Sequence, residues 1–478
     1  MPPSPTHAAL QGYDLAAIRQ SVVGIDVQVP TLSGIVKPYI NLDNAASTPT
    51  LRCVLDAVNG SMPYYSSIHR GAGYKSQLST ALYEGARAAV LRFVGGDAAR
   101  HVVIFGKNAT EVINALAYHI GQDPDGIVLS TVIEHHANLL PWRLHTQLHY
   151  VEVDEHGSMD LADLERQLQM YGKRVKLVAV CGGSNVTGCV PPVHEVARIA
   201  HRYGTQILVD AAQLAPHRAI DMGTPGCDDA LDYIVFSAHK MYAPFGTGVL
   251  VGPPAIFESS PPAIVGGGTV DIVMEDEIIW SDAPHRQEAG SPNVVGAIAL
   301  TAAINEMERL GMDAIAAHEK ELTAYALDRL DEVPGIDIYG CASLANHDRL
   351  GVISFNLAGH HHARVAAILT YEHAVAVRNG CFCAHPYLLH LLEMSQPDTQ
   401  ECREKIRRHD YSAIPGAVRL SFGIYSTHAD VDTAVEALKI VAAGNEQGTY
   451  TLDAQAGQYS PDNFRFDFTD LAWAKPLI

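Results

Sequence analysis

Cysteine, positive charge and long apolar runs are all scarce in this chain of 478 residues. It has only eight cysteines, which is far below the density of a disulfide-stabilised scaffold and is typical of a reducing cytoplasm. Its 33 lysine and arginine residues are outnumbered by 53 aspartate and glutamate residues, and the resulting net charge of −20 disfavours nucleic-acid binding. No apolar run approaches the roughly 18 residues that span a membrane, and the N-terminus lacks the pattern of a secretory signal. We therefore expect a cytoplasmic protein that binds neither nucleic acid nor membrane.

Short apolar runs alternate with helical patterns between about residues 40 and 300. Runs that are apolar at consecutive positions are typical of strands buried on both faces. A helical pattern such as that of 192–203 lies between two of them. Alternating strands and helices predict an α/β fold with a mainly parallel sheet covered by helices on both sides. The six apolar runs are 101–105, 126–130, 176–180, 206–210, 232–236 and 248–252.

The chain is long enough for two or three domains, and its patterns change at three places. A predicted helix over about 295–310 ends at Gly311. After it, predicted strands at 351–357 and 417–423 alternate with helices, as in a smaller α+β domain. We predict an N-terminal arm that joins the small domain (1–40), a large cofactor-binding domain (41–308), a small C-terminal domain (309–445) and a tail (446–478).

Polar residues follow the apolar runs at the strand ends, where open α/β sheets bind ligands. The helix start at Ala109 and Thr110 would hold a phosphate with backbone N–H groups, although a plain helix N-cap is the simpler interpretation. His135 follows the next run, and a lone histidine is usually structural. Asp210 ends a further strand, where an acid also serves as a helix cap. The other polar residues at strand ends are Ser184, Asn185, Gln213, Ser237, His239 and Lys240.

Together these residues form the set that pyridoxal 5'-phosphate (PLP) needs. A lysine such as Lys240 carries the aldehyde as an imine, and an acid such as Asp210 keeps the pyridine nitrogen protonated. A flat ring such as His135 stacks on the cofactor. We expect PLP as the cofactor, with unrelated structural roles for these residues as the alternative.

Eleven motifs spread over about residues 41–440 point to one family. Among them are NLDNAAST (41–48), EHHANLLPW (134–142), FSAHKMYAPFGTG (236–248) and VRNGCFCAHP (377–386). In these motifs the chain resembles the class V aminotransferases, specifically their cysteine desulfurase and selenocysteine lyase branch. The resemblance implies a fold-type I PLP-dependent transferase, with a seven-stranded sheet in the large domain and a homodimeric assembly.

The resemblance also implies roles position by position. Lys240 matches the imine-forming lysine, Asp210 the acid at the pyridine nitrogen, Gln213 the contact to the ring hydroxyl and His135 the stacked imidazole. Arg419 matches a clamp for the substrate carboxylate, a role that suits a guanidinium. Further implied cofactor contacts are Ala109, Thr110, Asn185, Ser237, His239 and, reaching the neighbouring subunit's cofactor, Gly268 and Thr269. Further implied substrate contacts are His69, Arg70, Asn185 and Arg378.

Cys383 matches the nucleophilic cysteine of the desulfurases, which takes up the substrate's sulfur as a persulfide. The attacking species is a thiolate, which a cation such as Arg378 would favour. The motif departs from the common desulfurase form, which has two histidines where Cys381 and Phe382 stand, and is similar to the desulfurase domain of molybdenum cofactor sulfurases. A buried, inert thiol is the alternative for either cysteine.

No metal site is expected, although two patterns suggest one. The Cys381-x-Cys383 pair lacks a second pair of ligands at matching spacing. The run His360–His362 points its side chains in different directions, so a helix start at the domain surface is the better interpretation.

The leading hypothesis is a desulfurase that converts L-cysteine, or selenocysteine, to alanine and passes the sulfur to Cys383. The alternatives are a C–S β-lyase, an epimerase or an aminotransferase on the same scaffold, and a non-catalytic scaffold, against which the intact Lys240 and Asp210 argue. We expect a small amino-acid substrate, a homodimer and a sulfur-acceptor protein. The segment 393–416 is interpreted as a surface insertion, with a lid or an interface as the alternatives, and the tail as wrapping the surface or a partner subunit.

Overall fold

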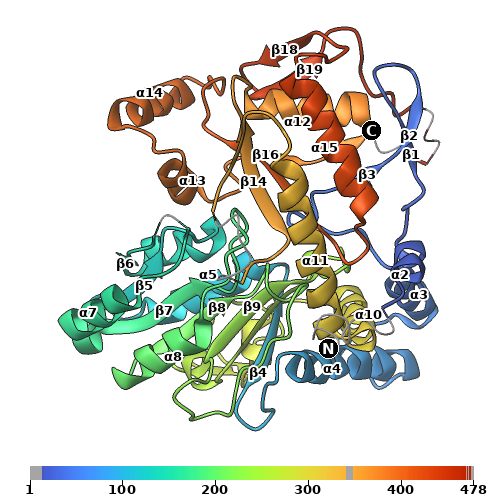
Figure 1. The fold of residues 1–478 in the computed structure, drawn as a ribbon. Helices are drawn as coiled ribbons and strands as arrows, with labels where there is room; N and C mark the ends of the chain where they lie inside the picture. Colours follow the sequence, from blue (N-terminus) through green and yellow to red (C-terminus); the bar gives the residue numbers. More distant parts are fainter. Residues whose placement is uncertain (1–12, 155, 341–347, 470, 472, 475–478) are drawn as a thin grey trace, which may run out of the picture.

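A seven-stranded sheet forms the centre of the molecule (Figure 1). The computed structural model describes residues 13–154, 156–340, 348–469, 471 and 473–474; the first twelve residues of the predicted arm and the end of the predicted tail lie outside the described residues. In the sheet, β10 runs antiparallel to both β4 and β9, and the other neighbours pair in parallel. The predicted α/β fold with a mainly parallel seven-stranded sheet is confirmed. In spatial order the strands are β4 (Val102–Gly106), β10 (Gly248–Gly252), β9 (Tyr233–Ser237), β8 (Gln206–Asp210), β7 (Val175–Cys181), β5 (Ile127–Thr131) and β6 (Gln147–Val151).

Successive residues of the central strands enter two different hydrophobic clusters, because side chains alternate between the faces of a sheet. In β7, Leu177 and Ala179 pack in one cluster, whereas Val178 and Val180 pack in the other. Both faces are buried, which explains why the apolar runs are continuous. The edge strand β6 is half exposed and carries polar residues, so the search for apolar runs missed it.

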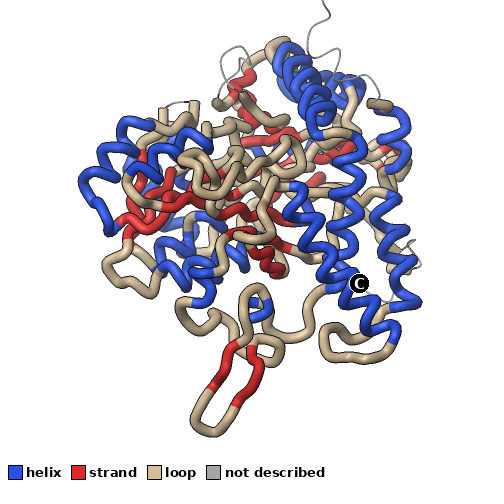
Figure 2. Tube along the Cα trace, turned by 90° about the horizontal axis from the view of Figure 1, so that it is seen from below, coloured by secondary structure: helices blue, strands red, loops and turns tan. Residues whose placement is uncertain are grey.

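Helices cover both faces of this sheet, and Figure 2 shows the strands in the middle with helices on either side. On one face lies α5 (Ala109–Ile120), whose Val112, Ile113 and Leu116 pack against the sheet. On the other face lie α8 (Val193–Arg202), α4 (Tyr74–Phe93), α10 (Val294–Leu310) and α3 (Arg52–Ser61). None of the described helices is long and apolar enough to cross a membrane.

A second, four-stranded antiparallel sheet supports the C-terminal part of the chain. Its apolar side packs against α11, α12 and α15 in a hydrophobic cluster of its own. The strands are β13 (Ile336–Ile338), β14 (Val352–Leu357), β17 (Ala417–Ser421) and β16 (Arg378–Gly380), and the helices are α11 (Met312–Leu330), α12 (His362–His373) and α15 (His428–Ala442). The segment predicted as an insertion contains α14 (Gln396–Arg407), preceded by α13 (His385–Leu391).

The N-terminal arm contacts the C-terminal part of the chain. Its helix α2 (Leu15–Ser21) carries Arg19, which forms an ion pair with Asp430 of α15 at 2.8 Å. Farther along, the N–H of Leu32 donates to the carbonyl of Tyr371 at 2.7 Å. These contacts support the proposal that the arm belongs with the small domain. The arm also contains β1 (Gln28–Pro30), β2 (Val36–Pro38) and β3 (Ile40–Asn41).

The described part of the tail folds back on its own chain. Strands β18 (Tyr450–Asp453) and β19 (Gln458–Pro461) form a hairpin that Figure 1 places beside α12. Glu372 of α12 anchors it by accepting hydrogen bonds from the hydroxyl of Tyr450 and from the N–H groups of Gln447 and Gly448. The hairpin therefore packs against the C-terminal part of its own chain.

Candidate active site

A cavity of about 670 Å³ lies where β5, β7, β8 and β9 end. It also reaches the C-terminal part of the chain at β16 and β17. Because neighbouring parallel strands end at the same edge of a sheet, residues far apart in the sequence meet there. Twelve of the sixteen predicted site residues line the cavity: Ala109, Thr110, His135, Asn185, Asp210, Gln213, Ser237, His239, Lys240, Arg378, Cys383 and Arg419.

Lys240 and Asp210 carry opposite charges in this cavity, and each stabilises the charged form of the other. Asp210 is buried at the end of β8, where it accepts a hydrogen bond from the N–H of Ala212 at 3.0 Å. Burial raises the pKa of Asp210, and the charge of Lys240 counteracts this effect. Burial also lowers the pKa of Lys240 to about 8, although the negative charge of Asp210 acts to raise it. Among the described residues, the Lys240 amine has neither a hydrogen-bond nor an ion-pair partner, so its partly neutral nitrogen is available as a nucleophile.

His135 presents a neutral ring. Its Nδ1 accepts a hydrogen bond from the N–H of Ala137 at 3.0 Å, which leaves the ring proton on Nε2. Burial, and to a smaller extent the charge of Lys240, lowers the pKa of His135 to about 3, so the imidazole stays uncharged at neutral pH. The preceding Glu134 is buried and accepts a hydrogen bond from Asn138 at 2.7 Å, which holds the turn in place.

The start of α5 forms another side of the cavity. The side chain of Asn108 caps this helix by accepting from the N–H of Glu111 at 3.0 Å. The N–H of Ala109 donates to the hydroxyl oxygen of Ser237 at 2.8 Å, and no described residue accepts the hydroxyl proton of Ser237. Thr110 is exposed toward the cavity. Hydroxyl and N–H donors at the positive end of a helix suit a phosphate group.

Arg419 is buried and held in place by oxygen atoms. Its Nη2 donates to Asp43 at 3.0 Å, and its Nη1 donates to the carbonyl of Asn185, also at 3.0 Å. Its guanidinium lies 4.8 Å from the centre of the Phe382 ring, a cation–π contact. Its Nε is buried and has no partner among the described residues. The fixed guanidinium therefore keeps a free donor, as a clamp for a carboxylate requires.

A strained loop presents Cys383 to the cavity. Phe382 and Cys383 have φ angles of 52° and 55°, a backbone region that residues other than glycine rarely adopt. The loop is held because the carbonyl of Phe382 accepts from Asn185 at 2.6 Å and the carbonyl of Cys383 accepts from the N–H of His136 at 2.7 Å. The Cys383 side chain is exposed. Strain maintained by surrounding contacts is typical of functional sites.

Cys381, two residues earlier, has the opposite environment. It is buried, and its Sγ donates a hydrogen bond to the carbonyl of Pro415 at 2.8 Å. Burial raises the pKa of Cys381 to about 12. This thiol is therefore a poor nucleophile, and it attaches the cysteine loop to the segment after α14.

Comparisons with known proteins identify the family. A family model for class-V aminotransferases matches residues 40–434. The chain belongs to the class-V aminotransferase family. It is 34% identical to a cysteine desulfurase of Haloferax volcanii, over 88% of this chain and 94% of that protein. The apo structure of a cysteine desulfurase from Thermococcus onnurineus NA1 has a TM-score of 0.75 and 32% identity, covering 90% of this chain and 98% of that one. The S-sulfonic acid form of the cysteine desulfurase CsdA from Escherichia coli has a TM-score of 0.73 and 27% identity, covering 91% and 100%.

These matches confirm the predicted family and the fold of a class-V aminotransferase. The geometry also fits the cofactor expected for such an enzyme. Gln213 donates through Nε2 to the carbonyl of Ala45 at 2.8 Å, but its buried Oε1 has no partner among the described residues. A ring hydroxyl would supply the missing donor. Together with the free Lys240 amine and the buried Asp210, this acceptor fits PLP.

Four predicted site residues of this class-V aminotransferase lie outside the cavity of their own chain. Arg70 donates to the carbonyl of Val270 at 3.4 Å, and the buried Thr269 closes a turn by donating to the carbonyl of Gly266. Gly268 lies in the same turn, before β11 (Val270–Val273) and β12 (Ile278–Trp280). The role of Gly268 and Thr269 at a neighbouring subunit's cofactor stays a prediction, as does the substrate role of Arg70 and His69.

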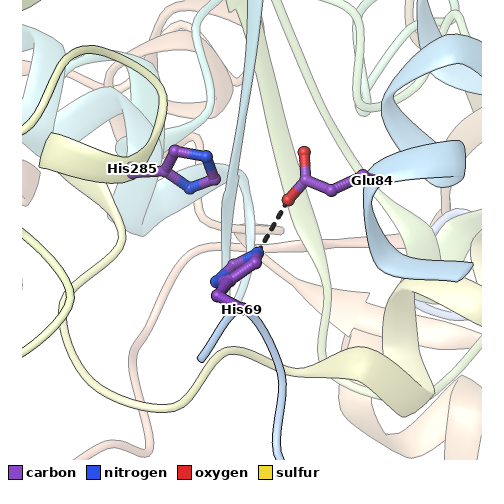
Figure 3. A group of neighbouring side chains, drawn as sticks. All are labelled: His69, Glu84 and His285. Carbon is purple, nitrogen blue, oxygen red and sulfur yellow. Dashed lines mark hydrogen bonds and ion pairs between the residues drawn. The ribbon is translucent and has the colours of Figure 1, made fainter. Parts of the chain in front are cut away.

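His69, the fourth, belongs to a separate group with Glu84 and His285 (Figure 3). Its Nε2 lies 2.8 Å from Glu84 Oε1, and one ligand-type atom from each residue lies within 4.8 Å of the others. Glu84 also accepts from Arg87 Nε at 2.9 Å, so its carboxylate is already neutralised by a guanidinium. We interpret this group as an anchor that attaches the loop of His69 to α4.

Sequence reasoning missed several residues that the structure brings to the cavity. Asp43 lies in a recognised motif, and a search for an acid complementary to Arg419 would have drawn attention to it. The predicted helix start at the histidine run is confirmed at His362, but a surface position is wrong for this residue, because His362 is buried against the carbonyl of Ile414. No sequence signal indicated five further lining residues, which are Tyr411, Ile414, Ala456, Gly457 and Gln458.

Proposed function

We propose that this protein is a PLP-dependent cysteine desulfurase, which converts L-cysteine to alanine and holds the sulfur as a persulfide on Cys383. The observation that carries the proposal is the exposed thiol of Cys383 in the same cavity as the Lys240 amine and the buried Asp210. The curated relatives named cysteine desulfurase support it. Selenocysteine, with the heavier atom at the same position, is accepted by the same chemistry.

Each residue has a role that follows from its contacts. Bound PLP supplies an electron-accepting ring that stabilises negative charge on the substrate carbon. Arg419 grips the substrate carboxylate through its free Nε, and His135 contributes a flat, uncharged surface. The Lys240 amine, neutral in part because its pKa is about 8, accepts the proton from the substrate Cα.

Sulfur transfer requires the Cys383 thiolate. The thiolate attacks the sulfur of the substrate, so that an S–S bond forms and the C–S bond breaks. The electron pair of the broken bond stays on the substrate carbon, which takes up a proton to give alanine. Sulfur and protons balance without an external oxidant: cysteine and one protein thiol give alanine and one persulfide.

The proposal includes a homodimer in the cytoplasm. Exposed apolar side chains surround the turn of Gly268 and Thr269, as in Ile264, Val265 and Ile272, and a second copy would cover them. Arg70 contacts this segment, so it would approach the same interface. Six cysteines of the described residues are free thiols, as expected in a reducing compartment: Cys53, Cys181, Cys227, Cys381, Cys383 and Cys402.

Incubation of the purified protein with PLP and L-cysteine tests the proposed reaction. We expect equal amounts of alanine and of a 32-Da mass increase on the peptide that contains Cys383 during the first turnover, since one sulfur atom is transferred. Pyruvate in place of alanine, without the mass increase, would instead identify a C–S β-lyase. Absence of any product from L-cysteine would refute the proposal.

A further inference from the structure

The cavity extends beyond Cys383 to a wall made by two segments of the C-terminal part. This outer wall consists of Tyr411 and Ile414, which follow α14, and of residues 456–458 at the tip of the hairpin, where Gln458 begins β19. The family match ends at residue 434, so the hairpin lies beyond the part that class-V aminotransferases share. The hairpin part of the wall is therefore a feature that the proposed desulfurase reaction does not explain.

The outer wall is fixed in place. The N–H of Tyr411 donates to the carbonyl of Ala454 at 2.7 Å, which joins its two segments. The carbonyl of Ile414 accepts from His362 Nε2 at 3.1 Å, and Glu372 anchors the hairpin to the same helix, α12. Figure 1 shows β18 and β19 against α12. A molecule that reaches Cys383 from this side therefore meets a preformed surface.

The chemistry of this surface favours a small polar anion. Tyr411, Gln458 and the ring of His361 offer neutral hydrogen-bonding groups, and burial lowers the pKa of His361. Arg378, which is exposed on β16, adds a positive charge. The described carboxylates that line the cavity are those of Asp43 and Asp210, which face Arg419 and Lys240.

We propose that the space between Cys383 and the outer wall binds a second substrate, a low-molecular-weight thiol that carries a carboxylate, and that this thiol receives the sulfur from Cys383. The proposal rests on the proposed desulfurase function. The acceptor's thiolate attacks the terminal sulfur of the Cys383 persulfide, and a new S–S bond forms on the acceptor. The S–S bond to Cys383 breaks, and the Cys383 sulfur leaves with the electron pair and takes up the proton that the acceptor lost. No oxidant or reductant is needed.

A tryptophan at the outer wall tests this site. The PLP-loaded protein is first converted to its persulfide with one equivalent of L-cysteine, and the loss of the persulfide is then followed against 3-mercaptopropionate or the uncharged 2-mercaptoethanol. Gln458→Trp fills the proposed site, whereas Gln455→Trp places the same side chain in the adjoining turn of the hairpin, at a residue outside the cavity lining. We expect the rate of persulfide loss to reach half its maximum at a 3-mercaptopropionate concentration at least about tenfold below that for 2-mercaptoethanol. Gln458→Trp is expected to raise this half-saturating concentration of 3-mercaptopropionate about tenfold. Gln455→Trp is expected to behave as the unchanged protein.

Two outcomes would overturn the acceptor site, and a third concerns the reaction itself. The rate of persulfide loss could instead rise linearly with both thiols, without saturation, and be unchanged by Gln458→Trp. That result would show that thiols react with an open persulfide by simple collision, as expected if the acceptor is a protein. A loss of first-turnover alanine in Gln458→Trp would show that the wall contacts the amino-acid substrate instead. If the unchanged protein forms neither alanine nor persulfide, the desulfurase function fails, and with it this inference.

Discussion

Replacing each cysteine of the Cys381-Phe382-Cys383 motif in turn separates a reactive thiol from a structural one. Burial raises the pKa of Cys381 to about 12, so at pH 7.5 only about 3 in 100,000 molecules carry a Cys381 thiolate. Cys383 is exposed in the cavity and Cys381 is buried against Pro415, so Cys381 does not take over the role of Cys383. We expect Cys383→Ser to lower alanine formation at least about a thousandfold.

Cys381→Ser is the matched control, because it makes the same atomic change two residues away. A serine hydroxyl still donates to the Pro415 carbonyl, so we expect alanine formation within about threefold of the unchanged protein and a stability loss of about 1 kcal/mol. Alanine release and the mass of the cysteine peptide are measured on the same samples, and urea denaturation gives the stability. Retained desulfuration in Cys383→Ser, or its loss in a folded Cys381→Ser, would refute the reasoning.

Three further predictions concern the charged groups. The Lys240 amine is free to act as a base only when substrate is bound, so its pKa of about 8 should appear in kcat, and kcat for L-cysteine should rise as the pH passes through about 8. Asp210→Asn should shift this rise to lower pH, since the Asp210 charge raises the Lys240 pKa; a rise that Asp210→Asn leaves in place would contradict the assignment. Arg419→Lys should raise KM for L-cysteine about tenfold or more in steady-state kinetics, because an ammonium lacks the planar guanidinium that Asp43 and Asn185 hold in place. An unchanged KM would show that Arg419 does not bind the substrate. Glu288→Gln should lower the free energy of unfolding in urea by about 1–3 kcal/mol, because it removes the buried charge that pairs with Arg87 at 2.7 Å and leaves Glu84 as the remaining carboxylate partner of Arg87. An unchanged free energy of unfolding would contradict this.

Much of the inner site was predictable because parallel strands impose a simple geometry. The residues that follow β8 and β9 must meet at one edge of the sheet, so Asp210 and Lys240 were expected together before any contact was known. Strand β6 was missed because an edge strand is only half buried and has no continuous apolar run. The domain limits at 40, 308 and 445 stay predictions.

The sequence by itself determined the fold and the set of reacting groups. Strands buried on both faces must be apolar throughout, and the polar residues that interrupt this pattern mark the strand ends. Only the tertiary structure decided how Cys381 and Cys383 differ, because burial depends on the carbonyl of Pro415, 34 residues away. It likewise brought Asp43 to Arg419, across 376 residues, and the tail hairpin to the far side of the cavity. Such contacts depend on how whole elements pack, which no local pattern of residues records.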